Sequence, residues 1–129
     1  MPLTDIYGAE IGIYSFSTDT RSPSANIEFD LGSFRDPLGN LHLRKTCVDG
    51  TDPAVQDWIK VDPRYGPLLN QCIILVKDHF NGESKARWFS LGFRDHHGTW
   101  ISRAVATLVA NELAALGYKV GVMHAKGQD

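Results

Sequence analysis

The sequence lacks the chemistry that marks several large protein classes. Its 129 residues contain only two cysteines, Cys47 and Cys72, which are far apart and outside any CxxC spacing. This excludes a disulfide framework and gives no zinc motif, so we expect a reduced, cytoplasmic protein. No GxxxxGK[ST] motif occurs either, and a Walker-type ATP site is therefore not expected.

Long apolar runs and a strong charge of one sign are also missing. The longest aliphatic run, Ile73 to Val76, is far too short to cross a membrane, and the N-terminus does not follow the pattern of a signal peptide. We therefore expect a soluble, unprocessed chain with no membrane partner. The formal charge of −2 gives no general attraction to nucleic acid, so contact with RNA would need a local basic patch.

The remaining composition suits one small domain. With 43% hydrophobic residues the chain can build one core, and we interpret residues 1–129 as a single domain with a core from about 11 to 124. Alternating apolar residues predict strands, and three- and four-residue spacing predicts helices. The predicted strands are Ile11–Phe16, Asn26–Leu31, 86–93 and 118–124, with a further extended segment at Leu41–Arg44. The predicted helices are a short one from Pro53 through Trp58, then Pro67–Phe80 and 101–116.

The order of these elements predicts an α/β fold. Strand 86–93, helix 101–116 and strand 118–124 should form a right-handed βαβ unit with parallel strands. We expect a small mixed sheet that carries this C-terminal βαβ unit and flanking helices. Ligands gather at the carboxyl ends of the strands in such folds.

The segment from Arg87 to Arg103 is the most informative part of the chain. Its strand stops at Arg94, and the next nine residues (Asp95 to Arg103) hold two histidines, a glycine, two hydroxyls and a second arginine. Unpaired N–H groups at a helix start favour an anion in such a loop. A cation at a helix start is unfavourable unless it shares an anion, so we consider two roles for Arg103. It binds a phosphate or carboxylate, or it pairs with an acidic residue such as Asp30 or Asp95.

A second polar loop, from Ser17 to Ser22, follows the first strand and faces the same edge if that strand is parallel to the βαβ pair. Its hydroxyls and Arg21 suit sugar or phosphate oxygens, and a flexible polar loop is the alternative. His124 ends the last strand at this edge. The candidate ligand-binding residues are Ser17, Thr18, Arg21, Arg94, His96, His97, Gly98, Thr99, Ser102, Arg103 and His124.

The run Asp95-His96-His97 does not predict a metal site. Adjacent histidines rarely both reach one ion, and no third ligand follows at motif spacing, so we expect neither a metal nor a cofactor. One loop histidine could transfer protons or donate to a phosphate in a pH-dependent way, or it could simply make hydrogen bonds in solvent. We interpret Asp49 and Asp52 as turn and helix-cap residues.

Several local patterns occur in one order along the chain. They are Ser15-Phe16, Phe29-Asp30 with Asp36-Pro37, Asp49 to Val55, Ser102 to Val105, Gly117 to Val120, and His124. Together they resemble the C-terminal domain of the RNase adaptor protein RapZ family, roughly from Ile11 to His124, without that family's N-terminal nucleotide-binding domain. The resemblance implies an α/β domain that self-associates, binds an amino-sugar phosphate and contacts small regulatory RNA and partner proteins.

The family's signature loop reads Gly-Cys-Thr-Gly-Gly, two residues ending in His, then Arg-Ser-Val. Gly92, Arg103 and Val105 match it, but Phe93 stands where the family has cysteine, and the loop here is longer. The family loop has the Cys-to-Arg spacing of phosphatase loops, in which a thiolate attacks phosphorus. Phe93 removes that thiol, and Cys72 lies on an apolar helical face. We therefore name no catalytic residue and expect a non-catalytic regulatory domain that binds a phosphorylated small molecule such as a sugar phosphate.

Two other functions stay open. The domain could be an adaptor for structured RNA or a protein, which would use the residues Lys85, Arg87, Arg94, Arg103 and Trp88 or Trp100. It could also be a hydrolase or transferase with His96 or His97 as general base, although no set of nucleophile, base and orienting group can be assembled. We expect a homodimer, which a tryptophan on an exposed face (Trp58, Trp88 or Trp100) would favour.

Overall fold

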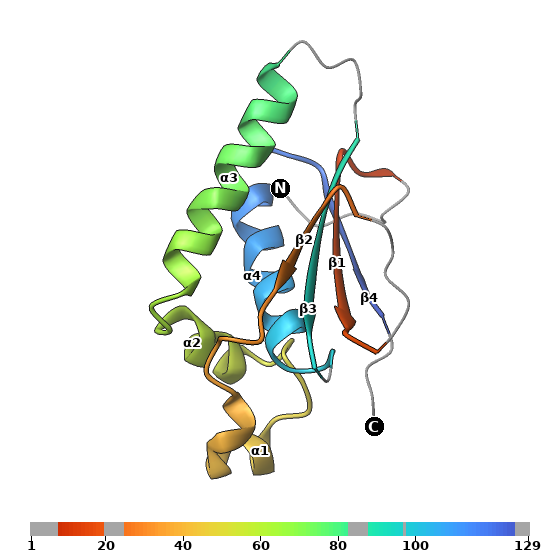
Figure 1. Cartoon of the computed structure of the whole chain (residues 1–129). Coiled ribbons are helices and arrows are strands. Elements are labelled where there is room, and N and C mark those ends of the chain that lie inside the picture. Colours follow the sequence, from red (N-terminus) through yellow and green to blue (C-terminus); the bar gives the residue numbers. More distant parts are fainter. Residues whose placement is uncertain (1–7, 20–24, 83–87, 97, 126–129) are drawn as a thin grey trace.

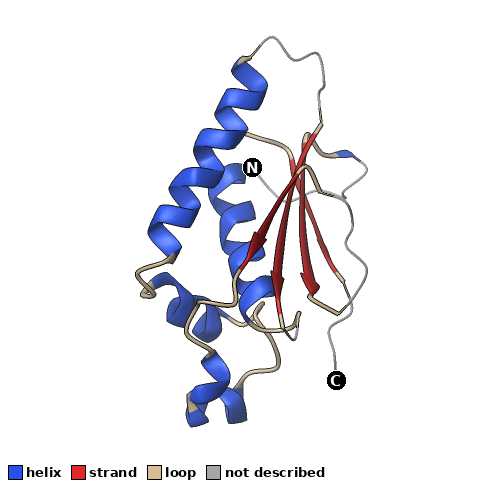
Figure 2. Cartoon of the chain, viewed as in Figure 1, coloured by secondary structure: helices blue, strands red, loops and turns tan. Residues whose placement is uncertain are grey.

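The computed structural model describes residues 8–19, 25–82, 88–96 and 98–125, and every structural statement below concerns these ranges. Helices pack against one face of a four-stranded sheet (Figures 1 and 2). The strands are β1 (Ile11–Ser17), β2 (Ile27–Asp30), β3 (Phe89–Asp95) and β4 (Val120–His124), in the order β2-β3-β1-β4. The expected α/β fold with flanking helices is confirmed. The sheet, however, is not mixed, because every described strand pair is parallel.

The helices are α1 (Leu41–Thr46), α2 (Pro53–Lys60), α3 (Tyr65–Asn81) and α4 (Ile101–Ala115), with a short 3-10 turn at Pro37–Gly39. The three predicted helices are confirmed as α2, α3 and α4. The extended segment predicted at Leu41–Arg44 is wrong, since these residues begin α1. The side chain of Asn40 accepts a hydrogen bond from the backbone N–H of Leu43 at 3.1 Å, and this cap starts a helix too short for a periodic pattern to reveal.

The expected βαβ unit of β3, α4 and β4 is present, but β1 lies between its two strands. The connections from β2 to β3 and from β3 to β4 cross the sheet in one direction and carry the helices. From β1 to β2 the strand order runs in the other direction across the sheet. Ala25, just before β2, lies on the face opposite the helices, where a Cβ added at Gly92 would be 3.2 Å from the Ala25 Cβ.

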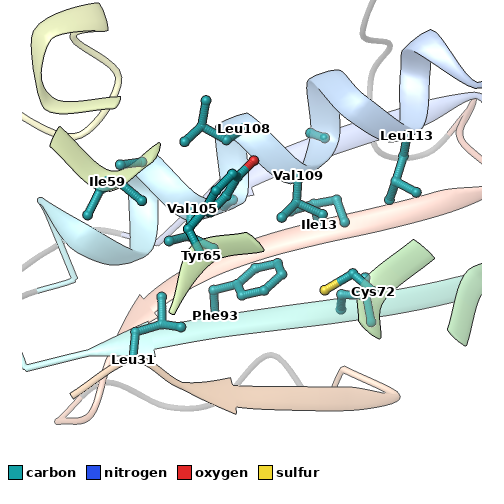
Figure 3. Packing of buried hydrophobic residues seen from close by; sticks show 14 of the residues in the cluster. Ile13, Leu31, Ile59, Tyr65, Cys72, Phe93, Val105, Leu108, Val109 and Leu113 are labelled. Atoms are coloured by element: carbon teal, nitrogen blue, oxygen red, sulfur yellow. The ribbon is translucent and has the colours of Figure 1, made fainter. Parts of the chain in front are cut away.

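The core fills the space between the sheet and helices α3 and α4 (Figure 3). Ile13 of β1, Phe93 of β3 and Val109 of α4 are all 0% exposed. Cys72 of α3 is also fully buried, which confirms its assignment to the core, and burial raises the pKa of its thiol to about 12. This core ends at the carboxyl edge of the sheet, where the chain becomes polar.

Candidate functional site

The carboxyl ends of the four parallel strands meet at one edge, next to the N-terminus of α4 (Figure 1). The loop from β3 to α4 turns tightly there. Gly98 has φ +69°, and its N–H donates to Asp95 Oδ1 at 2.7 Å. A Cβ at Gly98 would lie 2.6 Å from the backbone nitrogen of Ser17, so the loop packs directly on the end of β1. This close approach brings the first turn of α4 to the sheet edge.

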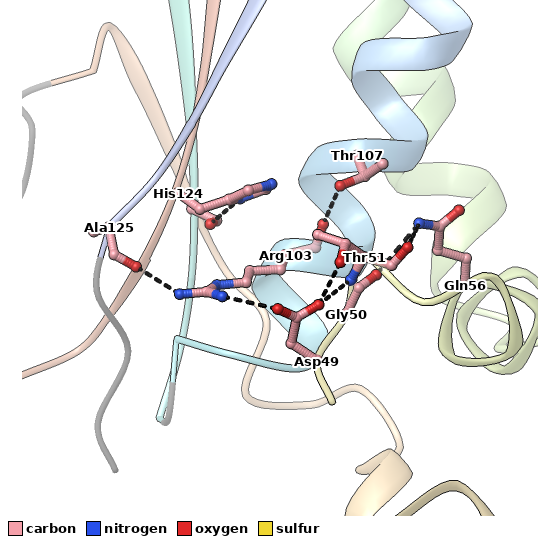
Figure 4. A network of polar contacts seen from close by, with 9 residues as sticks. Asp49, Gly50, Thr51, Gln56, Arg103, Thr107, His124 and Ala125 are labelled. Atoms are coloured by element: carbon pink, nitrogen blue, oxygen red, sulfur yellow. Dashed lines mark hydrogen bonds and ion pairs between the residues drawn. The ribbon is translucent and has the colours of Figure 1, made fainter. Parts of the chain in front are cut away.

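Arg103, in the first turn of α4, is the centre of a polar network (Figure 4). Its Nη1 donates to Asp49 Oδ2 at 3.0 Å and its Nη2 donates to the carbonyl oxygen of Ala125 at 3.1 Å. An ion pair of Arg103 is therefore present, but its partner is Asp49 and not the expected Asp30 or Asp95. Asp30 lies 3.7 Å from Arg94 on the neighbouring strand, and Asp95 is buried against Gly98.

Asp49 is itself held in place by its own turn. Its Oδ1 accepts from the N–H of Thr51 at 2.7 Å and from the Thr51 hydroxyl at 2.5 Å. Burial acts to raise the pKa of Asp49, but the hydrogen bonds from Thr51 and the charge of Arg103 outweigh it and hold that pKa below its ordinary value. Asp49 is thus a fixed carboxylate that orients the Arg103 guanidinium. The interpretation of Asp52 as a helix cap is confirmed, since its side chain accepts from the Ala54 N–H at 3.0 Å.

Gly50 allows the turn that carries Asp49 to touch α4. Its N–H donates to the carbonyl oxygen of Thr99 at 2.9 Å. A Cβ at this position would lie 2.5 Å from the Ala104 nitrogen and in collision with the Trp100 carbonyl oxygen. Only glycine permits this backbone-to-backbone approach, and Asp49 reaches Arg103 because of it.

His124, at the end of β4, lies beside this network (Figure 4). Its Nδ1 is 2.6 Å from the hydroxyl oxygen of Ser15. Burial and the charge of Arg103 lower the pKa of His124, whereas Asp49 acts in the opposite direction. Ser15 is 1% exposed and was not among the sequence candidates. The two-residue alternation of β1 was a signal for it, because Ser15 continues the core-facing row of Ile11 and Ile13.

Two polar atoms at this helix start are buried and, within the described residues, have no hydrogen-bond partner: Ser102 Oγ and Arg103 Nε. Ser102 is 0% exposed. No described side chain caps the N-terminus of α4, and its first turn holds no acidic residue. Buried donors without partners are rare in proteins, and here they lie beside the unpaired N–H groups of a helix start. Ser102 Oγ and Arg103 Nε are thus candidate donors for an oxyanion at the start of α4.

The other sequence candidates lie elsewhere on the edge. Ser17 is buried, and the N–H of the exposed Thr18 donates to the Asp95 carbonyl oxygen at 3.0 Å. Thr99 contributes its carbonyl oxygen to the contact with Gly50. Arg94 points away from the core beside Asp30, because it alternates with the core residue Phe93 on β3. Arg21 and His97 lie outside the described residues.

His96 lies on the β2 side of the edge. It lines a hollow of about 160 Å³ together with Phe34, Asp36 and Trp100. The candidates therefore fall into two groups. Arg103 and His124 come together toward β4, with Ser102 preceding Arg103 in α4, whereas Arg94 and His96 lie toward β2.

The residues considered for RNA or partner binding do not form one described patch. Lys85 and Arg87 lie outside the described residues. Trp88 is 38% exposed and packs over Gly12, on the sheet face opposite the helices. Trp58 donates its indole N–H to the Arg35 carbonyl oxygen at 3.2 Å, and the Arg35 guanidinium lies over its ring.

The described ranges contain no group of three or more histidine, cysteine, aspartate or glutamate side chains that could hold a metal ion. The helices found there are too short or too polar to cross a membrane.

Known proteins with similar sequences are longer than this chain. It is 32% identical over 118 aligned residues, in a match that covers 88% of this chain, to a nucleotide-binding protein of Cereibacter sphaeroides strain ATCC 17025. It is 33% identical to a nucleotide-binding protein of strain ATCC 17029 of that species and 32% identical to one of Ruegeria pomeroyi, again over 118 residues. The chain spans only 38 to 40% of the length of these homologues. No family model matches it.

Proposed function

We propose that this chain is a non-catalytic domain that binds an oxyanion, such as the phosphate of a small ligand, at the N-terminus of α4. The observation that carries the proposal is the pair of buried donors without partners, Ser102 Oγ and Arg103 Nε, at an uncapped helix start in the described structure. Helix N-termini bind anions through their free N–H groups and the helix dipole. The first turn of α4 therefore carries three kinds of donor, namely helix N–H groups, a hydroxyl and a guanidinium N–H.

The network around Arg103 supports binding more than simple structural pairing. Asp49 and the Ala125 carbonyl oxygen hold Nη1 and Nη2, which fixes the plane of the guanidinium. Nε then remains as the donor for a ligand oxygen. If Arg103 served only to pair with Asp49, burial of Nε and Ser102 Oγ would be an uncompensated cost.

The absence of turnover is supported by the residue at the position of the family's cysteine. Phe93 is fully buried and stacks on Phe29 with a centroid distance of 5.4 Å, so it belongs to the core. Cys72 is buried in α3, and its raised pKa leaves it as a neutral thiol. Neither residue offers a nucleophile to a ligand at Arg103.

The homologues and the local motifs support a more specific assignment. We propose that the chain is equivalent to the C-terminal domain of the RapZ family. We also propose that it acts in the cytoplasm as a homodimer. Its ligand would be a phosphorylated small molecule, either a sugar phosphate or, as the names of the homologues suggest, a nucleotide. Both classes present the phosphate oxygens that the α4 site is suited to bind.

An adaptor for structured RNA or a protein is the second candidate and has less support. Arg94 and Arg103, which it would need on one surface, each lie beside a carboxylate in different parts of the edge. A gel shift with structured RNA at low and high salt tests it, and absence of binding at low salt rejects it.

The main proposal is tested by a thermal shift screen with inorganic phosphate, sugar phosphates and nucleotides, against sodium chloride of equal ionic strength. A ligand at a hundred times its Kd adds about 2.7 kcal/mol to stability, which is a clear rise in Tm. Arg103→Lys keeps the charge but cannot serve Asp49, Ala125 and a ligand together, so the rise should be lost. Arg44→Lys, on the exposed side of α1, should keep it. If no anion stabilises the protein at millimolar concentration, the proposal is wrong.

A further inference from the structure

The site that we propose for an oxyanion holds almost no net charge of its own. Arg103 contributes one positive charge, and Asp49, at 3.0 Å from it, contributes one negative charge. The lowered pKa of Asp49 keeps it ionised, so protonation of this carboxylate does not alter the balance near neutral pH. Among the described residues of this network, the other group that can change its charge is His124.

His124 is positioned to gain a proton without losing its hydrogen bond. Ser15 Oγ lies 2.6 Å from Nδ1. When Nδ1 is unprotonated, the Ser15 hydroxyl donates to it; when Nδ1 carries a proton, the ring donates and the hydroxyl oxygen accepts. Both charge states of the imidazole are therefore satisfied by the same partner.

The groups that face His124 come from three elements. Arg103 belongs to α4 and opposes a positive imidazolium, Asp49 belongs to the segment between α1 and α2 and favours it, and Ser15 of β1 carries no charge. Without a ligand, the effects of burial and of the Arg103 charge outweigh that of Asp49, and the pKa of His124 lies below its ordinary value. A bound anion beside Arg103 would offset the guanidinium charge and reverse that balance.

We propose that oxyanion binding at this site is coupled to protonation of His124, so that the protein takes up a proton with the anion and binds it more tightly at acidic pH. This inference rests on the proposed function and adds a mode of regulation to it. Protonation of His124 changes the network from neutral to singly positive, which is the state that attracts an anion. By linkage, each rise of one unit in the pKa of His124 on binding corresponds to about a tenfold gain in affinity at low pH.

Sulfate is a suitable probe, because it stays a dianion over the range in which histidine titrates, from about pH 5 to about pH 8. Phosphate would itself change charge in this range. Isothermal titration calorimetry in two buffers with different ionisation enthalpies measures the protons taken up per sulfate bound. The wild-type chain should take up protons near neutral pH, and its affinity for sulfate should rise as the pH falls.

His124→Gln should remove both the proton uptake and the pH dependence while it keeps an acceptor for Ser15. The matched control is His42→Gln, an exposed histidine of α1, which should behave as the wild type. If His124→Gln does not fold, an NMR titration of the histidine rings in the wild type replaces it, and the pKa of His124 must be higher with sulfate than without.

The outcomes separate the two proposals. If the wild type binds no sulfate at any pH, the site itself is rejected. If it binds sulfate without proton uptake, if the uptake persists in His124→Gln, or if the pKa of His124 does not rise with sulfate, only the coupling to His124 is rejected.

Discussion

Asp49 and Arg103, 54 positions apart in the sequence, form an ion pair of 3.0 Å between the segment after α1 and the first turn of α4. The pair fixes an arginine at a helix start, where the dipole alone disfavours a cation. Arg103 Nε, however, has no hydrogen-bond partner among the described atoms. Arg94, which lies 3.7 Å from Asp30, also has a buried Nε without a partner among the described atoms, so Arg103 is distinguished by its place in the first turn of α4 next to Ser102.

Ser102→Ala should have opposite effects on stability and on binding. Removal of a buried hydroxyl that has no partner should raise the free energy of unfolding by roughly 1 kcal/mol in the absence of ligand. The reason is that the variant no longer buries a polar group without a hydrogen bond. The same change should weaken phosphate binding. Urea unfolding and calorimetry measure the two effects.

Ser90→Ala is the control for this test. The Ser90 hydroxyl accepts from the Asn26 N–H at 2.9 Å and donates to Asn26 Oδ1 at 3.0 Å. Its loss should therefore destabilise the protein by about 1 kcal/mol. If Ser102→Ala destabilises the free protein to the same degree, its hydroxyl is satisfied in the folded chain and the case for a ligand there weakens.

Gly50→Ala should destabilise the protein and separate Asp49 from Arg103. The added methyl group has no room against the Trp100 carbonyl oxygen and Ala104, so the turn must shift, at a cost of roughly 1–3 kcal/mol. Gly66→Ala is the matched control, because nothing lies within 4 Å of its added Cβ and alanine favours helix α3. Equal stability of the two variants in denaturant melts would contradict the packing of Gly50 on α4.

Gly98→Ala tests the tight turn between β3 and α4. Gly98 has φ +69°, and its added Cβ would lie 2.6 Å from the Ser17 nitrogen. Gly117 has φ +101° with open space around its Cβ, so Gly117→Ala carries only the backbone strain of about 1–2 kcal/mol. We expect Gly98→Ala to cost clearly more than Gly117→Ala in thermal unfolding. A smaller cost at Gly98 would show that the loop does not rest on β1.

The pH dependence of stability should carry a contribution from His124. The pKa of His124 is lowered from 6.5 in the folded chain, so the native state binds its proton less readily than the unfolded state does. This contribution is fully present above about pH 6.5 and is lost as the pH falls through the lower folded value. Urea unfolding of the ligand-free protein between about pH 5 and about pH 8 should show the loss. His124→Gln should flatten that part of the curve, and His42→Gln should leave it unchanged.

Local signals in the sequence predicted most of the secondary structure. Apolar spacing located α3 and α4, and Asp52 followed by Pro53 marked the start of α2. A six-residue helix such as α1 is too short for such spacing, and its start depends on the single cap at Asn40. The insertion of β1 between β3 and β4 depends on pairings between distant segments, which no local pattern records.

The candidate site was predictable only in part for the same reason. A helix-start arginine pointed to Arg103, but its partner Asp49 comes from a turn 54 positions away. The approach of that turn depends on the lack of a side chain at Gly50, which appears in the sequence as an ordinary turn residue. Ser15, in contrast, could have been found, because the alternation of β1 places it on the core-facing side at the sheet edge.

A residue-resolved NMR titration of the wild-type chain with inorganic phosphate distinguishes an oxyanion site at α4 from one elsewhere on the sheet edge. We expect saturable shifts of the backbone amides of Ser102 and Arg103, together with those of Gly50 and His124, while Gly66 in α3 stays unchanged. An absence of saturable shifts at these amides, or shifts centred instead on Arg94 and His96 toward β2, would contradict an oxyanion site at the N-terminus of α4.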